Sequence, residues 1–196
     1  IPIHYSRILY LPQSHITMDS IFKEALSNIK IIVSDVDGIL TDGTLFISSD
    51  SEFKRFHVDD GVAVSLARLA GIPLSFISAS KSDATTKRLK ELKIKHYFVG
   101  YLNKVEALDE VLKIFELSYD DVLYIGDGLV DIPVLERAGC KVSVPNAMKK
   151  VKEVASWITT TRGGEGVLLE VVSELLKAKG IYDDTLDDMR RKIYKD

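Results

Sequence analysis

Residues 31–38, Ile31-Ile32-Val33-Ser34-Asp35-Val36-Asp37-Gly38, join a short apolar run to a pair of acids. An uninterrupted apolar run of this length is typical of a strand buried on both faces of a parallel sheet. Asp35 and Asp37 are two residues apart, so their side chains share one side of an extended chain, and Gly38 gives the backbone freedom to turn. Two carboxylates so placed repel each other unless a cation or a proton lies between them. The stretch therefore predicts a strand that ends in a site for a hard cation such as Mg²⁺, with an acidic surface turn as the alternative.

Apolar runs and helical patterns alternate through the rest of the chain. Strands are expected at residues 73–77, 96–99, 122–125, 142–144 and 157–159, and helices at 20–28, 60–70, 82–93, 103–115, 131–138 and 167–177. Residues 45–48 and 53–56 flank a polar turn and predict a β-hairpin. This order predicts an α/β fold, a three-layer Rossmann-like sandwich with a mostly parallel sheet, in which ligands bind beyond the carboxyl ends of the strands.

Polar residues that suit a phosphate group follow the next two strands. Ser78-Ala79-Ser80 places a hydroxyl and free backbone N–H groups ahead of a helix, which predicts a phosphate cradle. The alternative is that Ser80 or Ser82 caps that helix. Lys104 stands at the start of the following helix, where the helix dipole disfavours a cation, so we expect it to face an anion in the crevice. The alternative for Lys104 is a solvated surface lysine.

The fourth strand again ends in carboxylates, within Gly126-Asp127-Gly128-Leu129-Val130-Asp131. Asp127 is expected to complete a metal site with Asp35 and Asp37, and Asp131 to hold a water or orient a neighbour. The alternative for Asp131 is that it caps the helix that begins there. Four successive strand ends thus deliver an acid pair, a hydroxyl, a lysine and a second acid pair, a combination that unrelated structural roles would rarely produce together.

Length and composition exclude several classes of protein. A chain of 196 residues with a net charge of −3 suits one globular domain, and its 26 basic and 29 acidic residues give no electrostatic case for binding nucleic acid. A single cysteine, Cys140, excludes an internal disulfide framework. No apolar run approaches the roughly 18 residues of a membrane span. Ile1–Thr17 does not have the pattern of a signal peptide, so a cytoplasmic location is expected.

The motifs resemble those of the haloacid dehalogenase superfamily of phosphotransferases, which occur in the same order. The specific ones are Asp35–Gly38 and Gly126–Asp131, while Ser78 and Lys104 stand where that family keeps its hydroxyl and its lysine. Only the hairpin and one helix fit between the first two motifs, so no cap domain is expected. The resemblance is to a capless branch and extends over about residues 29–178. It implies a phosphatase domain at 29–180, after an N-terminal extension and short helix at 1–28 and before a charged tail at 181–196.

The branch contains 3-deoxy-D-manno-octulosonate 8-phosphate phosphatase and deaminoneuraminate 9-phosphate phosphatase. The resemblance therefore implies hydrolysis of a phosphorylated sugar acid with Mg²⁺ as the cofactor. It implies that Asp35 attacks phosphorus and forms an aspartyl-phosphate, and that Asp37 donates and then accepts a proton. It also implies that the ion is held by the Asp35 carboxylate, the Asp37 main-chain carbonyl and Asp127.

The remaining roles that the resemblance implies concern the phosphoryl group. Ser78, Ala79 and Lys104 would bind its oxygens, and Asp131 would lie behind them, near Lys104 or a water on the metal.

Three positions depart from the branch. Ser80 stands where relatives often have Arg or Glu, Leu169 where they commonly have Arg, and Gly128 where many have a second Asp. The resemblance implies that the residues which relatives have at the first two of these positions contact the sugar acid. Because Ser80 and Leu169 replace them, the choice of substrate stays open.

The hairpin at residues 45–56 has more apolar surface than a solvated flap needs. Phe46, Ile47, Phe53 and Phe56 all lie in it. Exposed apolar patches of this kind mark interfaces, and the resemblance implies a homotetramer assembled through the hairpins. The alternative is that these side chains pack on the chain's own core.

Other functional classes are also consistent with parts of this pattern. A receiver-like regulatory domain gathers acids, a hydroxyl and a lysine around Mg²⁺, but it carries its phosphorylated Asp after a middle strand. A non-catalytic interaction domain, as in animal acylneuraminate cytidylyltransferase, is the alternative that Ser80 and Leu169 leave open, while intact Asp35, Asp37 and Lys104 disfavour it. A nucleotide-dependent dehydrogenase is disfavoured because no GxGxxG follows the first strand.

Overall fold

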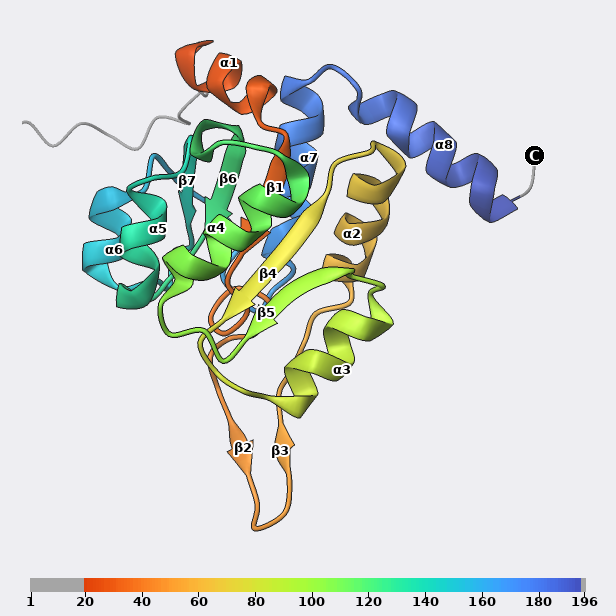
Figure 1. Cartoon of the computed structure of the whole chain (residues 1–196). Helices are drawn as coiled ribbons and strands as arrows, with labels where there is room; N and C mark the ends of the chain where they lie inside the picture. The colour runs from red at the N-terminus through yellow and green to blue at the C-terminus, as the bar shows by residue number, and fades with distance from the viewer. Residues whose placement is uncertain (1–19, 195–196) are drawn as a thin grey trace, which may run out of the picture.

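A six-stranded parallel sheet runs through the centre of the molecule (Figure 1), in the order β5-β4-β1-β6-β7-β8. The computed structural model describes residues 20–194, so the expected extension before residue 20 and the last two residues lie outside it. The strands of the sheet are β1 Ile31–Ser34, β4 Leu74–Ser78, β5 His96–Val99, β6 Val122–Ile125, β7 Cys140–Ser143 and β8 Trp157–Ile158. The predicted α/β class with a mostly parallel sheet is confirmed.

Helices cover both faces of this sheet, which gives the three layers that were expected (Figure 1). On one face α2 packs against α7, with α1 and α8 beside them, and on the other α4 packs against α5. The helices are α1 Ser20–Asn28, α2 Asp59–Leu69, α3 Asp83–Glu91, α4 Lys104–Phe115, α5 Ile132–Leu135, α6 Lys149–Val154, α7 Val167–Ala178 and α8 Tyr182–Tyr194.

The hydrophobic stripe of each long helix explains where it packs. In α7, the side chains of Val167, Leu168, Val171, Val172, Leu175 and Leu176 are all buried, at the spacing of one helical face. All four residues of β1 are buried, as expected for a central parallel strand. Cys140, the single cysteine, is a buried core residue in β7.

Some boundaries differ from the predictions. The helix expected at 131–138 is a 3₁₀ turn at Leu129–Asp131 followed by the single turn of α5. Helix α6 was not predicted, because its six residues have only two apolar side chains and no clear period. The charged segment at the C-terminus forms the long helix α8, in which Tyr182, Leu186 and Met189 pack against the core.

Between β1 and β4 the chain forms only a β-hairpin and helix α2, so the fold has no cap domain there, as expected. The hairpin strands, β2 Phe46–Ile47 and β3 Glu52–Phe53, pair with each other and, within the described part of the chain, with no further strand; they project from the end of the sheet (Figure 1). They are shorter than predicted. No helix among residues 20–194 is both long enough and apolar enough to span a bilayer.

Candidate active site

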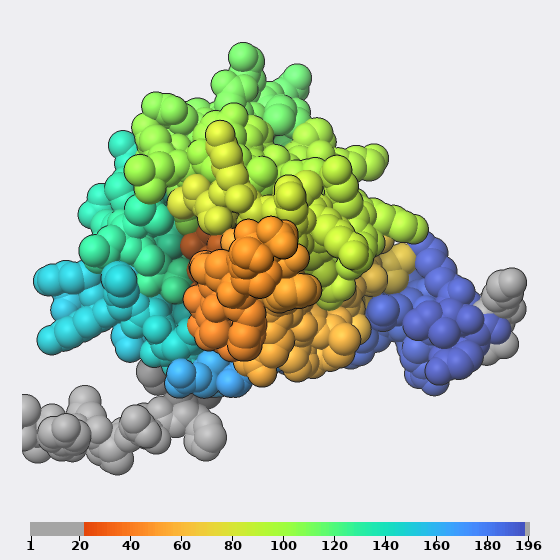
Figure 2. Space-filling model, turned by 90° about the horizontal axis from the view of Figure 1, so that it is seen from below, coloured from red at the N-terminus to blue at the C-terminus, as the bar shows by residue number. Residues whose placement is uncertain are grey.

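The carboxyl ends of the strands meet beneath the hairpin. Figure 2 looks onto this end of the molecule: the hairpin stands over its centre, and beside it the surface is hollowed down to atoms from the early, red part of the chain. The register explains the convergence, because Ser34, the last residue of β1, pairs with Phe76 of β4 and with Ile125 of β6. The residues that follow these strands therefore share one edge of the sheet.

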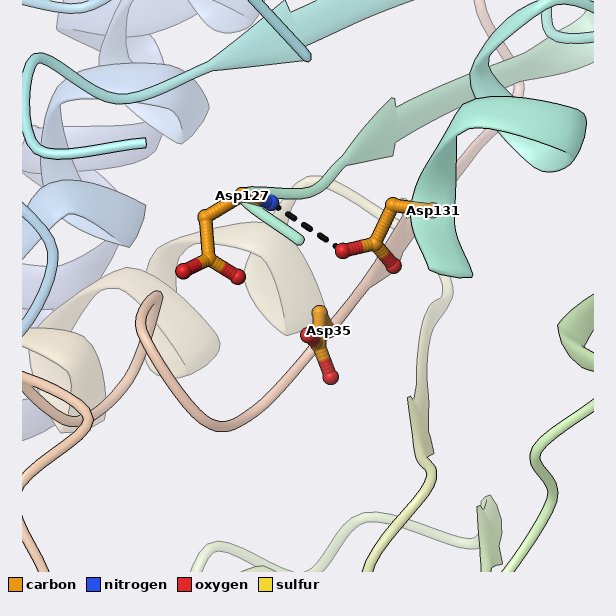
Figure 3. Close-up of side chains that lie close together, drawn as sticks. All are labelled: Asp35, Asp127 and Asp131. Atoms are coloured by element: carbon orange, nitrogen blue, oxygen red, sulfur yellow. Dashed lines mark hydrogen bonds between the residues drawn. The ribbon is translucent and has the colours of Figure 1, made fainter. Parts of the chain in front are cut away.

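Three of the predicted acids form a cluster at this edge (Figure 3). Asp35 follows β1, and Asp127 and Asp131 follow β6; one carboxylate oxygen of each lies within 4.8 Å of the others. Gly38 makes room for them. Its φ of +89° is a conformation that favours glycine, and a Cβ at this position would lie 2.0 Å from Oδ2 of Asp127.

Lys104 is buried between two of these acids. Its Nζ lies 2.8 Å from Oδ1 of Asp35 and 2.7 Å from Oδ1 of Asp131, and its side chain is 1% exposed. The surface alternative for Lys104 is thus wrong. Burial by itself lowers the pKa of this lysine, but the charges of Asp35 and Asp131 outweigh that effect and hold its pKa above the usual value.

Asp131 has its hydrogen-bonding capacity filled by the protein. Oδ1 accepts from Lys104 and from the hydroxyl of Tyr124, both at 2.7 Å. Oδ2 accepts from the backbone N–H of Asp127 at 3.1 Å and of Gly128 at 2.9 Å. No hydrogen bond from its side chain caps α5. Asp131 thus orients the lysine and the loop, which leaves Asp35 and Asp127 as the acids best able to hold a cation.

The electrostatics of this pair fit a divalent cation. Burial, followed by repulsion from Asp131, raises the pKa of Asp35 to about 8 and that of Asp127 to about 6. Two crowded carboxylates whose ionised forms are disfavoured in this way are stabilised by a cation between them. Hard oxygen donors of this type suit Mg²⁺.

Asp37 and Ser78 lie next to the cluster, on the side of the hairpin. The carboxylate of Asp37 is 30% exposed, and Oγ of Ser78 lies 3.4 Å from its Oδ2. The hydroxyl of Ser78 also accepts the N–H of Ser80 at 3.2 Å, and half-buried Ala79 follows β4 directly. The predicted alternative for this loop also holds for Ser82, whose side chain caps α3 by accepting the N–H of Thr85.

Two features of the site were not predicted. Lys54, at the base of the hairpin, forms an ion pair with Asp37 at 2.7 Å. The sequence predicts Tyr124 only as a residue of a buried strand, but in the structure its hydroxyl donates to Asp131. A single lysine in a predicted hairpin gives little sequence signal of its own, since hairpin lysines are usually solvated.

The glycine-rich segment at 162–166 packs against the loop that follows β1. The N–H of Gly164 donates to the carbonyl of Ile39 at 2.8 Å, and the N–H of Gly163 donates to Oδ1 of Asn146, also at 2.8 Å. A Cβ on Gly163 would lie 1.7 Å from the carbonyl oxygen of Gly38, so only glycine fits there. Leu169, one of the departures from the branch, packs partly buried against the core.

Comparisons with known proteins agree with this geometry. A family model described as haloacid dehalogenase-like hydrolase matches residues 98–171. The chain is 34% identical over 159 residues to 3-deoxy-D-manno-octulosonate 8-phosphate phosphatase of Haemophilus influenzae, a match that covers 81% of this chain and 88% of the relative. It is also 34% identical over 158 residues to the same phosphatase of Escherichia coli K12, covering 80% of this chain and 84% of the relative.

Solved structures show the same relationship. The phosphatase from Moraxella catarrhalis, determined with magnesium, phosphate and KDO, matches with a TM-score of 0.82 and 34% identity, covering 85% of this chain and 97% of that one. The cobalt-bound enzyme from Haemophilus influenzae matches with a TM-score of 0.78 and 34% identity, over 81% of this chain and 93% of that one. The chain belongs to the haloacid dehalogenase-like hydrolases, in the capless group of the 3-deoxy-D-manno-octulosonate 8-phosphate phosphatases.

Proposed function

We propose that this protein is a Mg²⁺-dependent phosphatase that hydrolyses a phosphorylated sugar acid of the 3-deoxy-D-manno-octulosonate 8-phosphate or nonulosonate 9-phosphate type. The observation that carries the proposal is the carboxylate pair Asp35 and Asp127 held beside the buried ammonium of Lys104, at the carboxyl end of the sheet. The identity to phosphatases of this group supports the reaction class.

In the first step, Asp35 attacks the phosphorus atom and the bond from phosphorus to the sugar oxygen breaks. Asp37 gives its proton to that oxygen, so the sugar acid leaves as an alcohol. In the second step, Asp37 takes a proton from water, whose oxygen attacks the aspartyl-phosphate and releases inorganic phosphate from Asp35. Splitting the displacement in this way replaces one difficult step by two easier ones.

The Mg²⁺ ion, held by the carboxylates of Asp35 and Asp127 and the main-chain carbonyl of Asp37, would offset the repulsion between the anionic nucleophile and the anionic substrate. Lys104 carries the second positive charge and, with Ser78 and the backbone of Ala79, binds the phosphoryl oxygens. Asp131 keeps Lys104 in place through the 2.7 Å contact.

Residues other than Ser80 and Leu169 determine which sugar acid the site accepts. Ser80 and Leu169 supply neither a cation nor an acid to a substrate carboxylate, so this enzyme must recognise the sugar acid with other groups. We further propose that residues 29–180 form the catalytic domain, that the protein acts in the cytoplasm, and that it assembles as a homotetramer through the hairpins.

The substitution Asp35→Asn tests the proposal because it keeps the size of the side chain and removes the nucleophile. The wild type should release phosphate from at least one of the two sugar-acid phosphates only when Mg²⁺ is present. Asp35→Asn should lose that activity by at least about 10³-fold, the scale on which removal of a nucleophile acts.

Phosphate release measured with and without EDTA gives the readout. Asp120→Asn, at an exposed acid remote from the cluster, is the matched control and should keep full activity. Full activity of Asp35→Asn, or phosphate release that does not respond to EDTA, would contradict the proposal.

A further inference from the structure

Lys54 is buried at the base of a hairpin that is otherwise open to solvent. Its side chain is 1% exposed, whereas its neighbours in the hairpin, Phe53 and Arg55, are 62% and 64% exposed. Burying an ammonium group is unfavourable unless its donors are paired. The position of this side chain is therefore fixed by its partners.

Those partners lie in the active site and on α3. Nζ of Lys54 lies 2.7 Å from Oδ1 and 2.9 Å from Oδ2 of Asp37, and 3.2 Å from Oγ1 of Thr85. Glu52, across from the lysine at 3.8 Å, accepts a hydrogen bond from Ser82, the residue that caps α3. The lysine thus ties the hairpin and the start of α3 to one active-site carboxylate.

Among residues 20–194, no other strong contact fixes the carboxylate of Asp37. The hydroxyl of Ser78 is 3.4 Å from Oδ2 and that of Thr41 is 3.5 Å from Oδ1, both at the limit of a hydrogen bond. The two short contacts with Lys54 span both oxygens of the carboxylate. Charge-assisted bonds of this length are stronger than neutral ones and define an orientation.

We propose that Lys54 is a positioning residue, which holds the carboxyl group of Asp37 in the orientation needed for proton transfer to the leaving oxygen and so makes the chemistry depend on the hairpin. This inference rests on the proposed function, in which Asp37 is the proton donor. Lys54 acts through Asp37 and does not itself touch the reacting atoms.

The leaving group gives a readout that a purely structural role would not produce. A sugar phosphate needs a proton on its departing oxygen, whereas p-nitrophenyl phosphate releases an anion that is stable without one. Asp37 is also the base of the second step, which is the same for both substrates, so the first step is measured alone, as release of the leaving group in a single turnover. In Lys54→Met this step should slow about 10²-fold for the sugar phosphate, the lower range of a general-acid contribution, and less than about 5-fold for p-nitrophenyl phosphate. The substrate concentration that half-saturates this step should change less than about 3-fold for both substrates, because binding is not affected.

Arg55 offers a matched control one residue away. It carries the same charge, and its contact is an exposed ion pair with Asp42 at 2.8 Å. Arg55→Met removes one positive charge from the same hairpin, so it should change kcat by less than about 3-fold with either substrate. Thermal unfolding of both full-length variants shows whether each is folded, and Lys54→Gln, which keeps a hydrogen-bond donor, replaces Lys54→Met if that variant does not fold.

Asp37→Asn completes the test as a double-mutant cycle. In the first step it should show the same selective slowing on the sugar phosphate, and adding Lys54→Met to it should cause no further slowing, because both changes remove one function. Equal slowing of the first step on both substrates, a rise in the half-saturating substrate concentration, an unchanged first step, or an Arg55→Met variant as impaired as Lys54→Met would overturn the proposal for Lys54.

Failure of the proposed function gives a different result. If the wild type hydrolyses neither substrate, the proposed reaction and the role of Lys54 both fall. If the wild type hydrolyses both and Asp35→Asn neither, while Lys54→Met slows the first step equally with both substrates, only the inference about Lys54 fails.

Discussion

At the scale of single residues, the acid cluster depends on a buried tyrosine that lies behind it. Tyr124 lies fully buried in β6, and its hydroxyl donates to Oδ1 of Asp131 at 2.7 Å. Burial and the nearby charge of Asp131 raise the pKa of this phenol, so the hydroxyl keeps its proton and remains a donor near neutral pH. It holds the acid that in turn holds Lys104.

Tyr124→Phe should destabilise the protein by about 1.5–3 kcal/mol, the range for a hydrogen bond to a charged group. The change removes only the hydroxyl, so packing of the ring is kept. Urea unfolding measures the difference. Tyr119→Phe is the control: its hydroxyl donates to Asp109 at an exposed position, and its removal should cost less than about 0.5 kcal/mol. Equal effects of the two substitutions would show that the Tyr124 hydroxyl has no special role.

The principal acids of the site and Lys104 could be predicted from the sequence, while the contacts that Tyr124 and Lys54 make with them could not. Asp35 and Asp127 follow apolar runs, and the ends of parallel strands meet at one edge whatever the details of the loops. Tyr124 and Lys54 are different. A tyrosine in a strand and a lysine in a hairpin are common, and only the packing of α5 and of the hairpin brings their polar atoms to Asp131 and Asp37.

At the scale of elements, α7 depends on a distant acid for its first turn. The helix follows Gly166, which has no side chain to cap it, and the N–H of Leu168 instead donates to Oδ1 of Asp60 in α2 at 3.2 Å. Asp60 is 2% exposed, and its Oδ2 has no hydrogen-bond partner in the part of the chain that the structure describes. Burial, partly offset by the bond from Leu168, raises the pKa of Asp60 to about 7.

This carboxyl should make stability fall as pH rises. The folded state holds the proton of Asp60 more tightly than the unfolded state, whose pKa is near 3.8. Its contribution is therefore complete below that value and is lost as pH rises through about 7. Asp60→Asn stays neutral, so between pH 5 and pH 8 it should gain about 2–3 kcal/mol over the wild type.

Thermal or urea unfolding at several pH values between 5 and 8 measures this difference. The comparison across pH matters, because any cost of the amide itself is the same at each pH. Asp59→Asn is the control, since this neighbour is 47% exposed and lies 3.6 Å from His57. A constant difference between Asp60→Asn and the wild type at all pH values would contradict the assignment.

Elements with a strong hydrophobic period were predicted well, and those without one were not. Helices α4 and α7 each bury one apolar stripe, and their observed bounds lie within one residue of the prediction. Helix α8 has seven acidic and basic residues from Asp183 to Lys192, so its sequence predicts a solvated segment. A few apolar side chains of α8 pack on the core and fix the position of the helix. Tertiary contacts of this kind leave no pattern in the local sequence that would predict them.

At the scale of the whole molecule, the hairpin is the part of the surface where a single chain leaves large apolar side chains exposed. Phe46 is 60% exposed, Ile47 76% and Phe53 62%, and no other strand in residues 20–194 pairs with the outer edges of the hairpin. Phe56 differs, because it packs against the core beneath Arg88, so for this residue the alternative of packing on the chain's own core is correct. Apolar side chains beside open strand edges favour association with other copies.

We therefore expect the wild type to be a tetramer by light scattering. The double substitution Phe46→Ser and Phe53→Ser replaces a cross-strand pair of the hairpin and should give smaller species, with an unchanged circular dichroism spectrum. Ile114→Ser is the control, since it removes an apolar side chain that is 46% exposed on α4 without touching the hairpin. Because the same hairpin carries Lys54 to Asp37, release of the leaving group in a single turnover of the dissociated variant should also slow more with a sugar phosphate than with p-nitrophenyl phosphate. A monomeric wild type would contradict the assembly and leave the hairpin to act within one chain.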